Sequence, residues 1–135
     1  MLEGRFPRDI GALPAIFEFV AQFGSAHGIT EDQRFDVDLI IEELFTNMVK
    51  YNTAGTRPIT IGLERERERL IITLRDFDVE PFDVTKPVPG RSNDPNEAPM
   101  PGGRGLQLVR QVADDVRYDY GDRNSIITVT KRLDS

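Results

Sequence analysis

The strongest constraint on the fold is a pair of alternating apolar segments separated by six charged residues. In residues 59–63, and again in residues 70–74, every second residue is Ile or Leu, which is the period of a half-buried strand. The run 64–69 between them alternates acidic and basic side chains, so we expect it to be the solvated tip of a β-hairpin. A second hairpin is expected from residues 116–120 and 126–131 around a Gly-Asp-Arg-Asn turn. The two hairpins predict an antiparallel sheet.

Helical periodicity elsewhere in the chain supplies a layer to cover this sheet. Apolar residues recur at helical spacing over about 12–26 and again from Leu106 to Val116. Thr30-Glu31-Asp32-Gln33 has the form of a capping box and predicts a helix that runs to about Asn52. The side chains expected on its buried side are Phe35, Leu39, Ile40, Leu44, Phe45, Met48 and Val49.

The order of these elements predicts the fold class. A short edge strand within residues 2–8, two helices, a hairpin, a third helix and a second hairpin make an α+β domain. We expect a two-layer α/β sandwich with helices on one face of a mostly antiparallel sheet. The 135 residues fit one domain, 1–135. Six prolines make residues 77–101 irregular, so a functional lid is expected at about 77–102.

Composition excludes several classes of function. The formal net charge of −6 argues against direct nucleic-acid binding, and no apolar run is long enough to cross a membrane. The chain has no cysteine and no signal-type stretch, so a cytoplasmic location is expected. Its single histidine, His27, precedes Gly28 where a helix should end, and is expected to be a helix C-terminal residue.

Two local patterns indicate a nucleotide site. Glu43 and Asn47 are four residues apart and therefore share one face of a helix, where a carboxylate among apolar neighbours is costly unless it is used. The glycine cluster in residues 102–105 runs directly into an apolar helical repeat, as phosphate-approaching loops do. Each pattern alone has an ordinary explanation, a solvated helix face or a hinge. The combination favours a helix that faces a glycine loop across a nucleotide.

Three motifs then resemble the GHKL ATPase superfamily. Glu43-Leu44-Phe45-Thr46-Asn47 resembles its N-box, and Asp76-Phe77-Asp78-Val79-Glu80-Pro81-Phe82-Asp83 resembles the following aspartate-x-glycine motif. Gly102-Gly103-Arg104-Gly105-Leu106 resembles the glycine motif. With the closing segment Asp114–Tyr118, the chain from about Pro7 to Leu133 is similar to the anti-sigma-factor serine kinases of bacterial partner switching.

The resemblance implies a role for each matching residue. Glu43 is implied as the general base that takes a proton from an attacking serine hydroxyl, and Asn47 as the Mg²⁺ ligand. Asp76 is implied to accept a hydrogen bond from the adenine amino group, with Asp78 in the same motif. The backbone of Gly103, Arg104, Gly105 and Leu106 is implied to bind the phosphates, and Thr128 on the last strand to help hold the adenine.

Asp78 departs from the family pattern, because the family usually has glycine there. Aspartate tolerates the left-handed backbone conformation better than most residues. Its charge opposes a triphosphate unless the side chain points outward or toward Arg75.

The function implied is that of a serine-protein kinase and anti-sigma factor. Such a protein binds Mg-ATP, sequesters a sigma factor and phosphorylates a serine of an anti-anti-sigma (STAS-type) protein, commonly as a homodimer. One alternative is a partner-binding module of the same fold, catalytically weak or inactive, that acts by sequestration alone. Another is the catalytic domain of a histidine kinase, although no phosphoacceptor histidine helix is present in this sequence.

Overall fold

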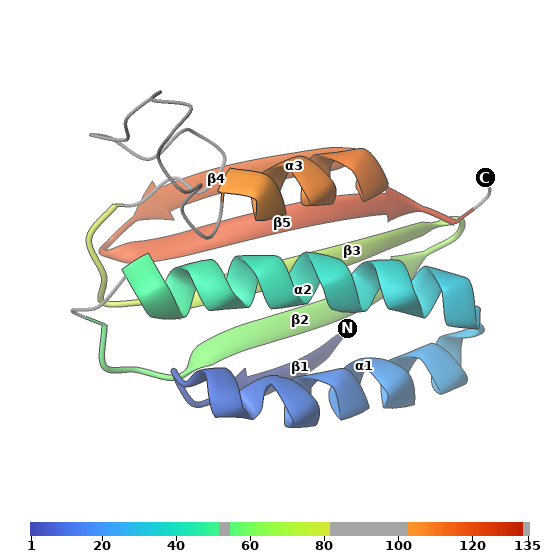
Figure 1. Ribbon diagram of the computed structural model, residues 1–135, viewed down its shortest axis with the longest axis horizontal. Coiled ribbons are helices and arrows are strands. Elements are labelled where there is room, and N and C mark those ends of the chain that lie inside the picture. Colours follow the sequence, from blue (N-terminus) through green and yellow to red (C-terminus); the bar gives the residue numbers. More distant parts are fainter. Residues whose placement is uncertain (52–54, 82–102, 134–135) are drawn as a thin grey trace, which may run out of the picture.

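The computed structural model describes residues 1–51, 55–81 and 103–133, and in this part it is a five-stranded sheet with helices on one face (Figure 1). The elements are β1 (Leu2–Phe6), a 3-10 turn η1 (Ile10–Ala12), α1 (Leu13–His27), α2 (Glu31–Tyr51), β2 (Ile59–Glu66), β3 (Arg69–Phe77), α3 (Gly103–Val112), β4 (Asp115–Gly121) and β5 (Asn124–Arg132). Every strand pair is antiparallel, in the order β1-β2-β3-β5-β4. This architecture confirms the predicted two-layer α+β fold. The predicted lid begins within the described residues, but from residue 82 to residue 102 it lies outside them.

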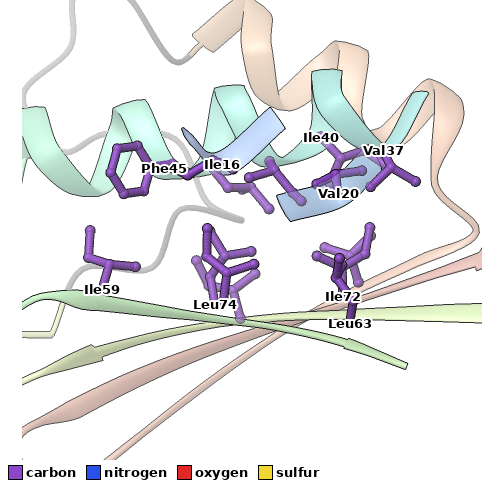
Figure 2. Close-up of a cluster of buried hydrophobic side chains, with 14 of the residues drawn as sticks. Ile16, Val20, Val37, Ile40, Phe45, Ile59, Leu63, Ile72 and Leu74 are labelled. Atoms are coloured by element: carbon purple, nitrogen blue, oxygen red, sulfur yellow. The ribbon is translucent and has the colours of Figure 1, made fainter. Parts of the chain in front are cut away.

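The core lies between the helices and the inner face of the sheet (Figure 2). Register places Leu63 opposite Ile72, Ile72 opposite Val129 and Leu74 opposite Ile127, so these side chains form continuous apolar rows. All of them are at most 1% exposed. Burial of each such side chain contributes about 1.5–3 kcal/mol, and the rows fix which residues of each strand face the helices.

The buried stripe of α2 differs from the prediction at Phe35, Val37 and Ile41. Phe35 is 69% exposed, whereas Val37 and Ile41, absent from the predicted stripe, are fully buried. The buried stripe is centred on Val37, Ile40 and Leu44. At 3.6 residues per turn, Phe35 lies about 200° around the helix from Val37 and therefore faces away from the sheet.

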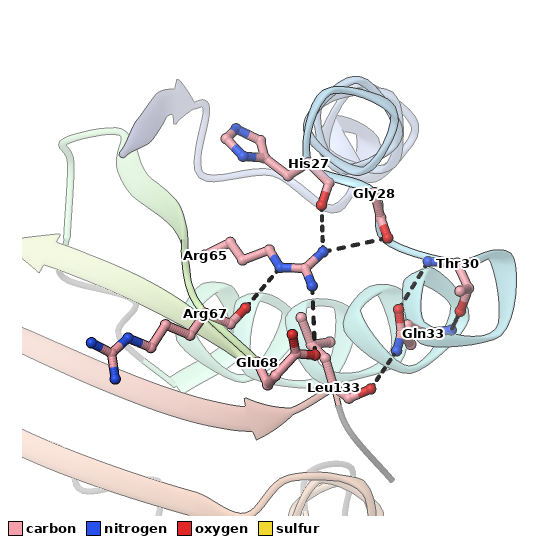
Figure 3. A network of polar contacts seen from close by, with 8 residues as sticks. All are labelled: His27, Gly28, Thr30, Gln33, Arg65, Arg67, Glu68 and Leu133. Atoms are coloured by element: carbon pink, nitrogen blue, oxygen red, sulfur yellow. Dashed lines mark hydrogen bonds and ion pairs between the residues drawn. The ribbon is translucent and has the colours of Figure 1, made fainter.

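Both ends of the α1–α2 connection are fixed by polar contacts (Figure 3). The Gln33 N–H donates to Thr30 Oγ1 (3.2 Å) and the Thr30 N–H donates to Gln33 Oε1 (2.9 Å), which confirms the predicted capping box. His27 is the last residue of α1, as predicted, and Gly28 closes the helix at φ 69°.

The charged run between β2 and β3 is not all a solvated tip. The strands continue to Glu66 and from Arg69, so only Arg67 and Glu68 form the turn. The guanidinium of Arg65 donates to the backbone carbonyls of His27 and Gly28 (Figure 3). A cation at this place satisfies the last carbonyls of α1 and interacts well with the helix dipole. Arg65 is therefore a structural residue that ties α1 to the hairpin.

Candidate functional site

The helix α2 presents Glu43 and Asn47 on the flank that faces α3. The two residues are one turn apart; Asn47 is 4% exposed and Glu43 is half-buried, while the neighbouring Glu42 is exposed. Asp36 lies two turns before Glu43 on the same flank. Its carboxylate pairs with Lys131 of β5 at 3.2 Å, and α2 and α3 pack against each other. The flank of α2 that carries Glu43 and Asn47 therefore faces α3 and the β4–β5 hairpin.

A buried carboxylate lies beneath the C-terminal end of α2. Asp76 of β3 is 0% exposed and forms an ion pair with Arg8, whose guanidinium also donates to the Met48 carbonyl of α2 at 3.3 Å. Gly55 lies against the same guanidinium, because a Cβ at Gly55 would come within 2.6 Å of Arg8 Cζ. Arg8 was not predicted as a site residue. It joins the N-terminal segment, α2 and β3 at the carboxylate of Asp76.

The partner of Asp76 on the last strand is Ser125, not Thr128. Register places Ser125 directly opposite Asp76, whereas Thr128 is opposite Thr73. Since side chains alternate along a strand, Thr128 lies on the face of the sheet away from the helices, and the structure does not bring it to Asp76. Ser125 is 1% exposed, and its Oγ has no hydrogen-bond partner among the described residues. A buried hydroxyl without a partner is unusual and marks a position where a ligand can be bound.

The predicted phosphate residues begin a helix. Gly103, Arg104, Gly105 and Leu106 are the first four residues of α3, and the side chains of residues 103–107 lie outside the described part. The N–H groups of a first helical turn lack intrahelical acceptors and carry the positive end of the helix dipole. Figure 1 shows that this end of α3 lies at the same end of the molecule as the C-termini of α2 and β3 and the N-terminus of β5. The first turn of α3 therefore lies at the same end of the molecule as the end of β3, which carries Asp76, and the C-terminal half of α2, which carries Glu43 and Asn47.

Asp78 adopts a left-handed backbone conformation. Its φ is +56°, in the left-handed region, and its N–H donates to Asn124 Oδ1 at 3.2 Å. The carboxylate accepts a hydrogen bond from Arg123 Nε at 2.8 Å, and this hydrogen bond together with the charge of Arg123 lowers the pKa of Asp78. The side chain is exposed and directed to Arg123 instead of Arg75. Its charge is neutralised by the turn between β4 and β5.

We expect the left-handed conformation to control the effect of substitutions at Asp78. Asp78→Gly should fold at least as stably as the wild type, since glycine adopts positive φ at little cost. Asp78→Ala removes the same carboxylate but places a Cβ in the left-handed region, so it should be clearly less stable than Asp78→Gly. Urea unfolding of the two variants measures this difference. Equal stability of the two variants would contradict the assigned backbone conformation.

The environment of Glu43 raises the pKa of its carboxyl group. Burial raises the pKa of Glu43 above the ordinary value of 4.5, the negative charge of Glu42 adds to this effect, and the positive charge of Lys50 opposes it. Glu43 forms no side-chain hydrogen bond or ion pair within the described residues. A carboxylate of raised pKa without a structural partner has the properties of a proton acceptor in catalysis.

The raised pKa of Glu43 predicts a pH-dependent difference between the wild type and Glu43→Gln. The folded protein binds a proton at Glu43 more tightly than the unfolded chain, so the ionised carboxylate destabilises the fold at high pH. This destabilisation is complete above the folded pKa and disappears as pH falls below the ordinary value of 4.5. The melting temperature of Glu43→Gln should exceed that of the wild type at about pH 8, and the difference should shrink toward about pH 4. A pH-independent difference would contradict this assignment.

Comparison with known proteins identifies the family. Residues 6–131 match the histidine kinase-like ATPase domain. The chain belongs to this family. No curated protein sequence matches the chain significantly. In this family member, the described residues contain no group of three or more His, Cys, Asp or Glu side chains placed to hold a metal, and no helix of the described part has the length and apolar character to cross a membrane.

Solved structures with the same fold come from several kinds of protein. The chain is 15% identical to a Mycobacterium tuberculosis protein with RsbU and RsbW domains, with a TM-score of 0.68 over 97% of this chain and 32% of that one. It thus spans about a third of that protein's length. The SiaB–SiaC complex of Pseudomonas aeruginosa contains a chain that is 10% identical, with a TM-score of 0.55 over 97% of this chain and 89% of that one. An Acinetobacter baumannii histidine kinase is 17% identical, with a TM-score of 0.53 over 100% and 69% of the two chains.

The site fits the nucleotide that an ATPase domain implies. Ser125, whose hydroxyl has no hydrogen-bond partner among the described residues, is paired on the neighbouring strand with Asp76, whose carboxylate is buried. A carboxylate acceptor beside a hydroxyl suits the amino edge of adenine. The side-chain oxygen of Asn47 is of the hard type that would suit a Mg²⁺ ion held mainly by phosphates and water. When bound, ATP would supply a transferable phosphoryl group.

Proposed function

We propose that the chain is an ATP-dependent serine-protein kinase and anti-sigma factor of the partner-switching type. The observation that carries this proposal is the gathering of Glu43, Asn47, Asp76 and the N-terminus of α3 at one end of the helix-covered face. Phosphoryl transfer requires mainly positioning and charge neutralisation, and each of these needs has a residue here.

Asp76 is proposed to recognise the adenine base of ATP. Its carboxylate is held under the end of α2 by Arg8, and a carboxylate accepts several hydrogen bonds at once. It can therefore accept a hydrogen bond from the adenine amino group while Arg8 fixes its orientation. We assign to Ser125 the role on the last strand that the sequence interpretation gave to Thr128, because of these two residues Ser125 is the one that lies on the inner face with Asp76.

The phosphate end of the nucleotide is proposed to lie between α2 and α3. The N–H groups of the first turn of α3 bind phosphate oxygens, and the side-chain oxygen of Asn47 binds Mg²⁺. Asn47 is 4% exposed, so its amide is already withdrawn from bulk water and has a fixed position. Asp78 does not add unpaired negative charge to this region, because Arg123 holds its carboxylate.

Glu43 is proposed as the general base for a serine hydroxyl of the partner. It lies one turn from Asn47 on the same flank of α2. Its half-buried position leaves the carboxylate accessible to a serine side chain. The raised pKa brings the group closer to the range in which a base works best near neutral pH.

A labelled phosphotransfer assay tests this proposal. The chain is incubated with Mg²⁺, γ-labelled ATP and a STAS-type protein from the same genome, and the product is treated with hot acid. Phosphoserine survives this treatment and phosphohistidine does not. Acid-stable label on the STAS-type protein supports the serine kinase. Acid-labile label favours a histidine-kinase activity, and sigma-factor binding without any label favours a module that acts only by sequestration.

A further inference from the structure

The open face of the sheet carries a positively charged groove behind the nucleotide site. The groove has a volume of about 540 Å³ and is lined by Glu3, Gly4, Arg5, Arg57, Pro58, Thr60, Arg75 and Phe77. Three of these eight residues are arginines and one is acidic, although the whole chain has a net charge of −6. A local excess of positive charge on an acidic protein needs an explanation.

The register of the sheet explains how the arginines converge. Arg5 of β1 and Arg75 of β3 are both paired with Thr60 of β2, so the three residues form one row across the strands on the same face. With strands about 4.8 Å apart, the two arginine Cα atoms lie about 10 Å from each other. The short side chain of Thr60 leaves a hollow between them. Arg57 closes one end of the row from the segment before β2.

The three guanidinium groups lack a close acidic partner in the described part of the chain, although the charge of Arg57 interacts with that of Asp78. Other arginines there have acidic partners, including Arg8, Arg117 and Arg123. Arg5, Arg57 and Arg75 form no ion pair or side-chain hydrogen bond within residues 1–51, 55–81 and 103–133. Five N–H donors on each guanidinium suit carboxylates, which they can bind in a bidentate manner.

We propose that this groove is a docking site for an extended, acidic segment of a partner protein. Carboxylates at alternate positions of an extended segment are about 7 Å apart, so two of them can each pair with one of the two arginines, whose Cα atoms are about 10 Å apart. Nucleic acid is disfavoured, since its phosphates extend beyond the groove over the acidic remainder of the surface. Phe77 adds an apolar contact surface at the rim.

The groove is directly connected to the nucleotide site through β3. Arg75 and Phe77 point to the groove, and Asp76 between them points to the inner face. An acidic segment bound here touches the residues on both sides of the carboxylate proposed to read adenine. The docking proposal itself rests on the groove alone and holds whether or not the chain is a kinase.

Fluorescence anisotropy with a labelled peptide of about eight residues, with glutamate at alternate positions, tests the groove at low salt. We expect binding to the wild type that weakens at least about tenfold in Arg5→Gln/Arg75→Gln. The matched control is Arg67→Gln/Arg69→Gln. It also removes two positive charges, but at the turn of the β2–β3 hairpin, far from the groove, and it should change the affinity by less than about twofold. Arg57→Gln tests the same groove with a substitution outside the strands, where the sheet is not altered. It should weaken peptide binding about threefold.

Several results would overturn the docking site. These are equal losses in both double variants, equal binding of a peptide with glutamine in place of glutamate, or no binding of the acidic peptide at low salt. Displacement of the peptide by inorganic phosphate at similar concentration would show a small-anion site instead. A concentration-dependent dimer that is lost in Arg5→Gln/Arg75→Gln would show that the face pairs with a second copy of the chain. Nucleotide binding in the same variants is measured separately, so failure of the groove is distinguishable from failure of the kinase proposal.

Discussion

Asp76→Asn is expected to weaken ATP binding strongly and to destabilise the protein. The carboxamide has no charge and only one acceptor oxygen, so it cannot accept hydrogen bonds from both Arg8 and the adenine amino group as the carboxylate can. Removing one partner of a buried ion pair costs about 3 kcal/mol or more, and loss of a hydrogen bond to a charged group weakens binding by about 10–100-fold. Urea unfolding measures the first effect and calorimetric titration with Mg-ATP measures the second.

Asp78→Asn is the matched control for Asp76→Asn. It makes the same chemical change two residues further along, on a carboxylate that is exposed instead of buried. We expect nearly wild-type stability and ATP affinity from this variant. If the two variants lost ATP affinity equally, the assignment of base recognition to Asp76 would be wrong.

Glu43→Gln is expected to slow phosphotransfer strongly and to preserve binding of ATP and of the sigma factor. Glutamine keeps the shape of the side chain but cannot accept the serine proton, and loss of a general base slows catalysis by about 10²–10⁴-fold. ATP affinity should stay within about threefold of the wild type, because Glu43 is not proposed to contact the base or the phosphates. Binding of the sigma factor should be unchanged. The rate of label transfer to the STAS-type protein, measured in a single turnover, gives the chemical step directly.

The neighbouring residue provides the control for Glu43→Gln. Glu42→Gln removes an equal charge from the same helix, but Glu42 is exposed and lies about 140° around the helix from Asn47, compared with about 40° for Glu43. Its single-turnover rate should stay within a few-fold of the wild type. A larger loss in Glu42→Gln than in Glu43→Gln would mean that the rotation assigned to α2 at the site is wrong.

Much of the fold could be predicted because local patterns and tertiary contacts agree. The strands around Ile61 and Ile72 and the capping box at Thr30 depend on local sequence and were placed correctly. Phe35 was misplaced because a helical repeat tolerates more than one apolar stripe, and only the packing of Val37 and Ile41 against neighbouring elements decides between them.

The site was harder to predict where it depends on pairing between distant segments. The choice of Thr128 followed from motif position, whereas the alternation of Ile127 and Val129 already implies that Ser125 shares their face. Arg8 carried no local signal, because its role arises only when the N-terminal segment meets Asp76. Aspartate tolerates positive φ better than most residues, so the sequence was compatible with the conformation of Asp78, but its partner Arg123 follows from the position of the second hairpin.

Calorimetric titration of the chain with ATP, with and without Mg²⁺, tests the nucleotide site most directly. The arrangement of Asp76, Ser125, Asn47 and the α3 N-terminus predicts Mg²⁺-dependent binding in the micromolar range, about 8 kcal/mol, with a weaker signal when Mg²⁺ is removed. Absence of heat at millimolar ATP, in a sample shown to be folded, would contradict the nucleotide site and with it the proposed kinase.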